Sequence, residues 1–118
     1  MKTMIIAAAA ALSLITGGPA VAQQTPEAEA DLRCFAAGLV LAGVTSEDKE
    51  TANAASLLAF YFLGRLEGRE AGVDWITKGI QLGNTEADTL LTVDLVRCGG
   101  ELEAKGADMM TKGQAAAG

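Results

Sequence analysis

The stretch DLRCFAAGLVLA, residues 31–42, combines apolar side chains at helical spacing with the first of the chain's two cysteines. Leu32 and Phe35 begin a series that recurs every three to four residues, which is the spacing of one helix face. Cys34 lies beside this face, so its sulfur is available to a neighbouring helix. We therefore expect a helix over residues 26–42 whose apolar side is buried.

The second cysteine, Cys98, ends the segment VRC and gives the chain an even number of cysteines. In a small exported chain this parity predicts a disulfide with Cys34, which closes a loop worth on the order of 4 kcal/mol. A metal pair would need further ligands, and a redox-active pair usually has the Cys-x-x-Cys spacing, which is absent. A catalytic thiol would need a basic partner, but Arg33 and Arg97 point about 100° away from their neighbouring cysteines on a helix.

The N-terminus predicts export. Residues 1–22 contain one lysine, a short apolar run and the helix-breaking GGP at 17–19, and they end in a small-x-small site. We expect a signal peptide that is cleaved between Ala22 and Gln23, which places the mature protein in the periplasm of a Gram-negative bacterium or outside the cell. The alternative is a membrane anchor, but the apolar run at 4–15 is shorter than the roughly 20 residues that span a bilayer. No later segment of the sequence is long and apolar enough to cross a membrane.

Charge and composition exclude several functions. The chain has 118 residues with 15 acidic and 9 basic side chains, a net charge of −6, and no histidine. Removal of residues 1–22 leaves 96 residues and a charge of −7, since Lys2 is lost. An acidic chain repels phosphate backbones, so nucleic-acid binding is not expected. The absence of histidine removes the commonest general base and zinc ligand, so neither a cofactor nor a metal is expected.

The mature chain is expected to be all-α: a compact bundle of about four helices, with the disulfide between the first and last. We place a single helical domain at 23–112 and a frayed tail at 113–118, because the tail has no apolar stripe. Residues 57–63 are apolar on every side, which favours a central position for the second helix. We also expect helices at 26–42, 45–71 and 74–82 and a last long helix that starts at Thr85. A turn is expected at Gly83-Asn84 and a bend or break at Gly99-Gly100, and Trp75, Ile76 and Ile80 are expected to face the core.

The most unusual stretch is GRLEGR, residues 64–69. Gly64 and Gly68 lie one turn apart, and each costs about 1 kcal/mol relative to alanine in a helix, so we expect a close helix packing there to compensate. Arg65 and Arg69 are also one turn apart. They are either solvated ion-pair residues beside that crossing or a binding site for an anion or carboxylate, whose oxygens suit guanidinium forks.

In layout, the chain resembles the HdeA-type acid-stress chaperones of the periplasm, with Cys34-Phe35 on an early helix and Val96-Arg97-Cys98 on a late one. The glycine-arginine stretch also resembles uncharacterised exported proteins of α-proteobacteria, and Tyr61-Phe62-Leu63-Gly64 is similar to the Tyr-x-x-Gly helix of periplasmic immunity proteins. The HdeA-type resemblance implies a signal-bearing helical protein with one disulfide.

Two functions follow as hypotheses. The first is a non-catalytic protein that binds another periplasmic protein, as chaperone, inhibitor or immunity factor. The alternative is a small anion- or ligand-binding module that uses Arg65 and Arg69. An enzyme is not expected, because no carboxylate pair stands out as a general acid and base in a chain without histidine.

Overall fold

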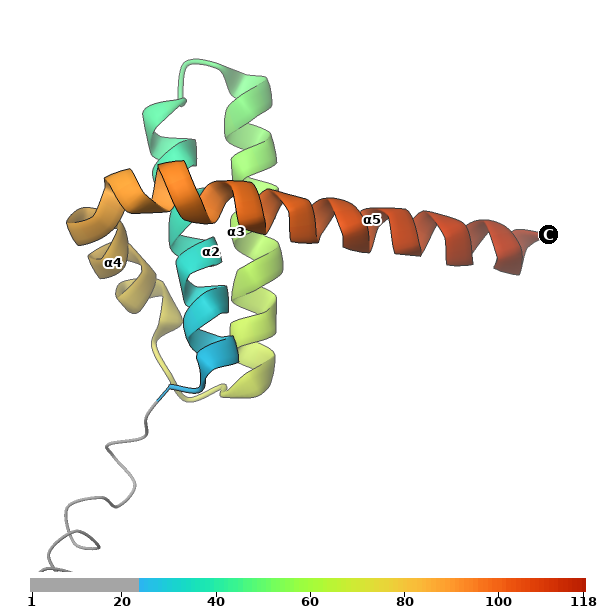
Figure 1. The fold of residues 1–118 in the computed structure, drawn as a ribbon, viewed down its shortest axis with the longest axis horizontal. Helices are drawn as coiled ribbons and strands as arrows, with labels where there is room; N and C mark the ends of the chain where they lie inside the picture. Colours follow the sequence, from blue (N-terminus) through green and yellow to red (C-terminus); the bar gives the residue numbers. More distant parts are fainter. Residues whose placement is uncertain (1–23) are drawn as a thin grey trace, which may run out of the picture.

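The computed structural model describes residues 24–118, which are helical almost throughout and contain no strand (Figure 1). The elements are α2 (Pro26–Val44), α3 (Lys49–Arg69), α4 (Trp75–Thr89), the π-helical turn η1 (Leu90–Asp94) and α5 (Leu95–Ala117). The predicted all-α class is therefore confirmed. The predicted signal peptide 1–22 and its cleavage site between Ala22 and Gln23 lie outside the described residues.

Helix α2 occupies the centre of the fold. The Thr25 hydroxyl accepts a hydrogen bond from the Ala28 amide at 3.0 Å and caps the helix, as the sequence predicts. Helix α2 then packs against all the other elements. The predicted central position of the second helix is wrong, since Leu57 and Phe60 of α3 are 65% and 68% exposed. An apolar run around a helix does not show which side lacks a neighbour, and α3 packs mainly through the one face that meets α2.

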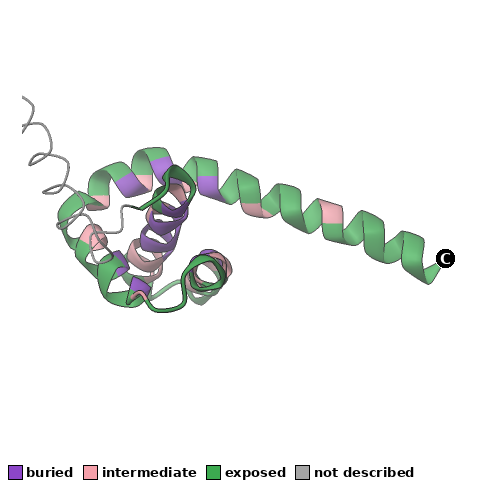
Figure 2. Ribbon diagram, turned by 90° about the horizontal axis from the view of Figure 1, so that it is seen from below, coloured by how far each residue is buried: buried purple, intermediate pink, exposed green. Residues whose placement is uncertain are grey.

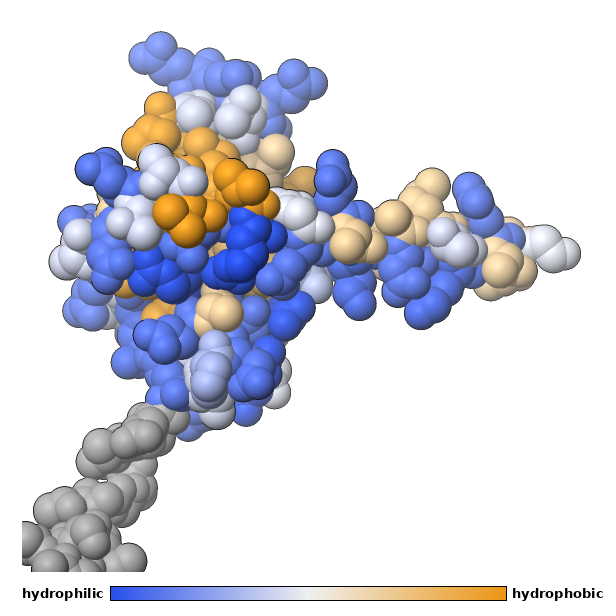
Figure 3. Space-filling view, viewed as in Figure 1, coloured by the Kyte–Doolittle hydropathy of each residue, from blue (hydrophilic) through white to orange (hydrophobic). Residues whose placement is uncertain are grey.

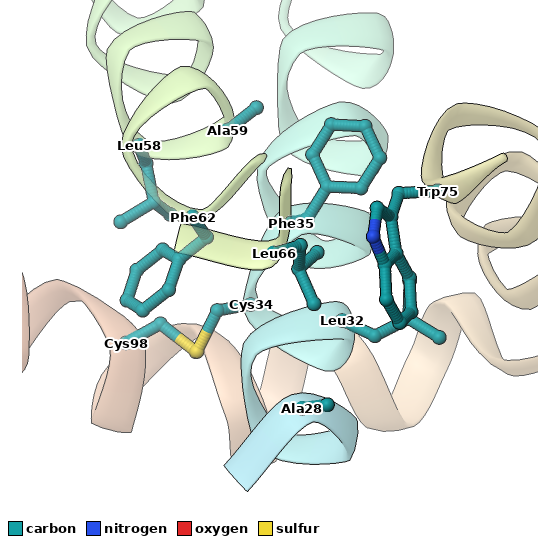
Figure 4. Packing of buried hydrophobic residues seen from close by; sticks show 10 residues of the cluster. All are labelled: Ala28, Leu32, Cys34, Phe35, Leu58, Ala59, Phe62, Leu66, Trp75 and Cys98. Atoms are coloured by element: carbon teal, nitrogen blue, oxygen red, sulfur yellow. A yellow bond between two sulfur atoms is a disulfide. The ribbon is translucent and has the colours of Figure 1, made fainter. Parts of the chain in front are cut away.

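The core lies where α2, α3 and the start of α4 meet (Figure 4). Phe35, Phe62 and Leu66 fill it together with Trp75, which is only 2% exposed. The indole Nε1 of Trp75 donates a hydrogen bond of 3.0 Å to the Glu70 carbonyl, so its polar atom is satisfied inside the core. The expected core positions of Ile76 and Ile80 are wrong: these side chains are 48% and 50% exposed, because α4 turns a glycine-containing face toward α2 instead.

The predicted turn at Gly83-Asn84 is absent, and the helix continues through it. A Cβ at Gly83 would meet a methyl group of Val40 at 3.0 Å, so the glycine serves the packing of α4 on α2. Thr85 does not cap a new helix, because its hydroxyl donates back to the carbonyls of Gln81 and Leu82. The change of direction comes at Glu86, with φ −132° and ψ 33°, and is followed by the π-helical turn η1.

Helix α5 starts on the body and then leaves it as an arm (Figures 1 and 2). The predicted frayed tail at 113–118 is helical to Ala117, and the Gly118 amide donates to the Gln114 carbonyl at 3.0 Å. The alanines of this segment are the best helix formers, which sustains the hydrogen-bond ladder without an apolar stripe. The bend expected at Gly99-Gly100 is not seen, because α5 is one continuous helix there.

Candidate functional site

The disulfide joins Cys34 of α2 to Cys98 of α5, the first and last helices of the described chain, as the sequence predicts. The two Cα atoms are 5.5 Å apart and both side chains are fully buried. Phe62 packs beside the sulfurs (Figure 4). The bond therefore fixes the base of α5 on the central helix, and only the part of α5 beyond it is free to leave the body.

The two predicted binding arginines do converge on a carboxylate, but it belongs to the chain itself. Asp31 of α2 is 3% exposed, and its Oδ2 accepts from Arg65 Nε at 3.1 Å and from Arg69 Nε and Nη2 at 3.2 and 3.0 Å. Arg65 Nη1 also donates to the Tyr61 hydroxyl at 3.2 Å, and its guanidinium lies 5.7 Å from the Tyr61 ring centre. The hydrogen bond to Tyr61 and then the charge of Asp31 raise the pKa of Arg65 above its ordinary value. Asp31 thus holds the position that an external anion would need.

A second buried carboxylate repeats this pattern at the other side of α2. Asp94, 5% exposed, accepts from Arg33 Nε at 2.9 Å and from Arg97 Nη2 at 3.1 Å. Arg33 reaches Glu86 as well, with 2.9 Å between Nη2 and Oε1. Burial disfavours the charge of Arg33, but the hydrogen bonds that Arg33 donates to Glu86 and Asp94 outweigh this effect and raise its pKa. Neither aspartate was singled out from the sequence, where the only signal was an acidic residue on an otherwise apolar helix face.

The predicted close packing at Gly64 and Gly68 is wrong. A Cβ at either glycine would meet no atom within 4 Å, and both residues are exposed. The close approaches are made instead by Gly38, where a Cβ would lie 2.9 Å from the Ala55 carbonyl oxygen, and by Gly79, where it would lie 2.5 Å from the Phe35 ring. The glycine spacing on α3 is real, but the helix turns this side away from α2.

The outward side of α3 therefore carries an unusual combination of residues. Leu57 and Phe60 are about two-thirds exposed, and the open Gly64 and Gly68 follow one and two turns further along the same side. We call these four residues the α3 outer face. Large exposed apolar side chains next to bare backbone are typical of a surface that another chain covers.

Two further features of the surface are open hollows. One of about 270 Å³ lies between α3 and α5 and is lined by charged groups that include Arg65, Glu101 and Lys105. The other, of about 240 Å³, lies between α2 and α4 and is lined by apolar groups that include Leu39 and Ile80. Among residues 24–118 no three acidic or cysteine side chains are grouped as metal ligands would be. No helix in this part of the chain could span a membrane.

Apolar side chains also gather where the start of α5 crosses the body (Figure 3). On η1 and the first turn of α5 the exposed apolar side chains are Val93 and Val96, which are 61% and 75% exposed.

Comparison with known proteins finds no matching family model, no matching curated protein and no matching solved structure. The resemblance to HdeA-type chaperones thus stays a prediction from the layout of the sequence.

Proposed function

We propose that this chain is exported, loses residues 1–22, and acts in the periplasm as a non-catalytic protein that binds another protein. The buried disulfide supports export, because such bonds persist in oxidising compartments and are rare in the cytosol. The N-terminal sequence supports cleavage between Ala22 and Gln23. The mature protein is then a small, disulfide-bonded helical domain that acts by binding a partner protein on its surface.

The observation that carries protein binding is the α3 outer face. Burial of a leucine or phenylalanine side chain contributes about 1.5–3 kcal/mol. Leu57 and Phe60 are largely exposed in the single chain, so most of this free energy can still be gained when a partner covers them. Gly64 and Gly68 leave the backbone uncovered at two positions one turn apart on this side of α3, which lets a partner's backbone come close. The expected occupant is a helix of the partner protein, since a glycine pair one turn apart suits a close helix crossing.

The geometry gives less support to the anion-binding alternative. Both guanidinium groups already donate to Asp31, and an external anion would have to displace a buried carboxylate of the same charge. The arginines instead fix α3 on α2, and this holds the α3 outer face in one orientation.

Photo-crosslinking in the native host tests the binding face. A benzoylphenylalanine at position 60 should crosslink one defined protein, whereas the same group at position 103 on the arm should not. With that partner purified, Phe60→Glu and Gly64→Leu should each weaken binding at least tenfold. Val96→Glu is the matched control for Phe60→Glu, because it introduces the same glutamate at an exposed apolar residue outside the α3 outer face. Equal loss with all three variants, or no loss with any, would contradict a specific site on α3.

Export has its own measurement. The mass of the protein recovered from periplasmic extract should match a chain that starts at Gln23 and lacks the two thiol hydrogens. An uncleaved chain with free thiols at Cys34 and Cys98 would contradict the proposed compartment.

A further inference from the structure

The ion pairs with Asp31 separate the charges at the C-terminal end of α3. The sequence GRLEGRE at 64–70 has two arginines and two glutamates, so its charges cancel in number. In the structure both arginines donate to the buried Asp31 of α2, which draws them toward that helix. Glu67 and Glu70 are exposed, and within residues 24–118 neither takes part in an ion pair. The cations are thus turned toward the body of the fold, and the acids are left to the solvent.

The α3 outer face is uncharged along its middle and has a carboxylate near each end. Residues 51–64 contain no charged side chain. Glu67 comes seven positions after Phe60, and Glu50 comes seven positions before Leu57, a spacing of almost two full turns that returns to the same side of a helix. Glu50 is exposed as well, and in the part of the chain that the structure describes it forms no ion pair.

Nearby cations do not reverse the sign at either end. Residues 47–50, EDKE, contain three acids and only Lys49 as a cation. At the other end, the two arginines of GRLEGRE share the charge of three acids, namely its two glutamates and Asp31. Glu50 and Glu67 are 17 positions apart, which is about 26 Å along a helix. This length is roughly three Debye lengths at physiological ionic strength, so each end attracts cations by itself.

We propose that the partner segment on the α3 outer face is a helix with lysine or arginine near both ends and small or apolar residues between them. This rests on the proposed function, in which a helix of another protein covers the same face. The middle of that helix covers the apolar residues and crosses at the glycine pair. Its cations meet Glu50 at one end of the face and Glu67 at the other, and such complementary charge gives an interface its specificity.

The same charges argue against a second copy of this chain as the occupant. Two α3 outer faces would bring acidic ends together in either orientation, because both ends of the face have the same sign. Like charges that face each other across an interface suppress the pairing. Since Glu50 and Glu67 lie at the edge of the contact, they are expected to act mainly on the rate of association, and this action weakens as salt is added.

Binding of three synthetic helical peptides tests the charge of the partner. Each peptide has about 20 residues, enough to span the roughly 26 Å between the two carboxylates, and is made of alanine and leucine in its middle. The peptides differ only in two residues at each end, which are lysine, glutamine or glutamate. Fluorescence anisotropy with the disulfide-bonded protein should show at least tenfold tighter binding of the lysine peptide than of the glutamate peptide. The glutamine peptide should lie between them, and the difference should shrink as salt is raised.

Paired substitutions locate the effect on the surface. Glu50→Gln together with Glu67→Gln should reduce the preference for the lysine peptide to less than threefold and leave the affinity for the glutamine peptide unchanged. Asp88→Asn together with Glu103→Gln is the matched control, because it removes the same two charges from exposed positions outside the face. This control should keep the full preference, which separates a local match from general attraction to an acidic protein.

The possible failures are distinct. Absence of binding of the lysine peptide, or an equal loss of preference in the control pair, would overturn the proposed partner chemistry. Phe60→Ala should weaken all three peptides alike, since it removes an apolar contact and no charge. Equal affinities for the lysine and glutamate peptides that still depend on Phe60 would contradict only the charge of the partner. Peptide binding that Phe60→Ala leaves unchanged would contradict the α3 outer face itself, and the charge of its partner with it.

Discussion

Replacement of Asp31 by asparagine tests whether the buried carboxylate holds α3 on α2. Asparagine keeps the size of the side chain and removes its charge. The variant leaves Arg65 and Arg69, which together donate three hydrogen bonds to Asp31 Oδ2, pointing at a neutral amide. An amide oxygen can accept one or two of these bonds, but it supplies no charge to balance two guanidinium groups.

The expected cost follows from burial. Removal of one partner from a buried ion pair typically costs about 3–5 kcal/mol, because a charge is left uncompensated. Here Asp31 has a side chain that is 5% exposed, whereas Arg65 and Arg69 are 37% and 36% exposed, so water recovers part of the loss. We therefore expect the free energy of unfolding to fall by about 2–3 kcal/mol. In a domain of this size that lowers Tm by roughly 10–20 °C.

The assay is urea unfolding with the disulfide intact, followed by the fluorescence of Trp75. This residue is the chain's one tryptophan and lies in the core between the helices concerned, so its emission reports the transition. Asp88→Asn is the matched control, because it removes the same charge from an exposed position of α4 and should change stability by less than about 0.5 kcal/mol.

A combined variant separates the ion pair from simple loss of packing. In a chain that already carries Arg65→Gln and Arg69→Gln, the further change Asp31→Asn should cost much less than it does alone, since no guanidinium is left unpaired. If Asp31→Asn costs no more than Asp88→Asn, or costs the same with and without the arginines, the carboxylate does not hold the helices as inferred.

Three further predictions concern stability. Simultaneous Cys34→Ala and Cys98→Ala should lower the free energy of unfolding by about 4 kcal/mol in urea titrations, because a 64-residue separation is no longer closed; a loss below 1 kcal/mol would contradict this. Gly38→Ala should destabilise the chain by about 1–3 kcal/mol, since its Cβ would lie 2.9 Å from backbone atoms of α3, whereas Gly64→Ala should stabilise it by up to about 1 kcal/mol; equal effects in thermal melts would show that the crossing is misplaced. The side chain and then the backbone amide of Thr77 donate hydrogen bonds to Asp74 and lower the pKa of its carboxyl below the ordinary 3.8. This cap therefore stabilises the fold at pH values above 3.8, and its contribution is lost as the pH falls through the lowered pKa. Asp74→Asn should therefore lose less stability than the unaltered chain between pH 4 and pH 2 in acid titrations followed by circular dichroism, and parallel curves would argue against the cap.

The candidate site could be predicted only in part. The sequence placed Arg65 and Arg69 on one side of a helix and left two interpretations open, solvated ion-pair residues or a binding site for an anion or carboxylate. In the structure both arginines donate to a buried carboxylate of the chain itself. The sequence did not indicate Asp31, which lies 38 positions from Arg69, because no local pattern links residues so far apart. The same limit explains Gly64: a glycine that meets a neighbouring helix and one that faces water look alike in the sequence.

What the amino-acid order determined is local or compositional. The helical class follows from the apolar spacing, the starts at Thr25 and Asp74 follow from side chains that cap within one turn, and the pairing of Cys34 with Cys98 follows from there being two cysteines. The arrangement in space had to come from the fold: α2 rather than α3 at the centre, the change of direction at Glu86, and an arm that leaves the body. The reason is that hydrogen bonds and caps within a helix are set by residues three or four positions apart. The covered side of each helix is set by contacts between distant segments, which compete for one small core.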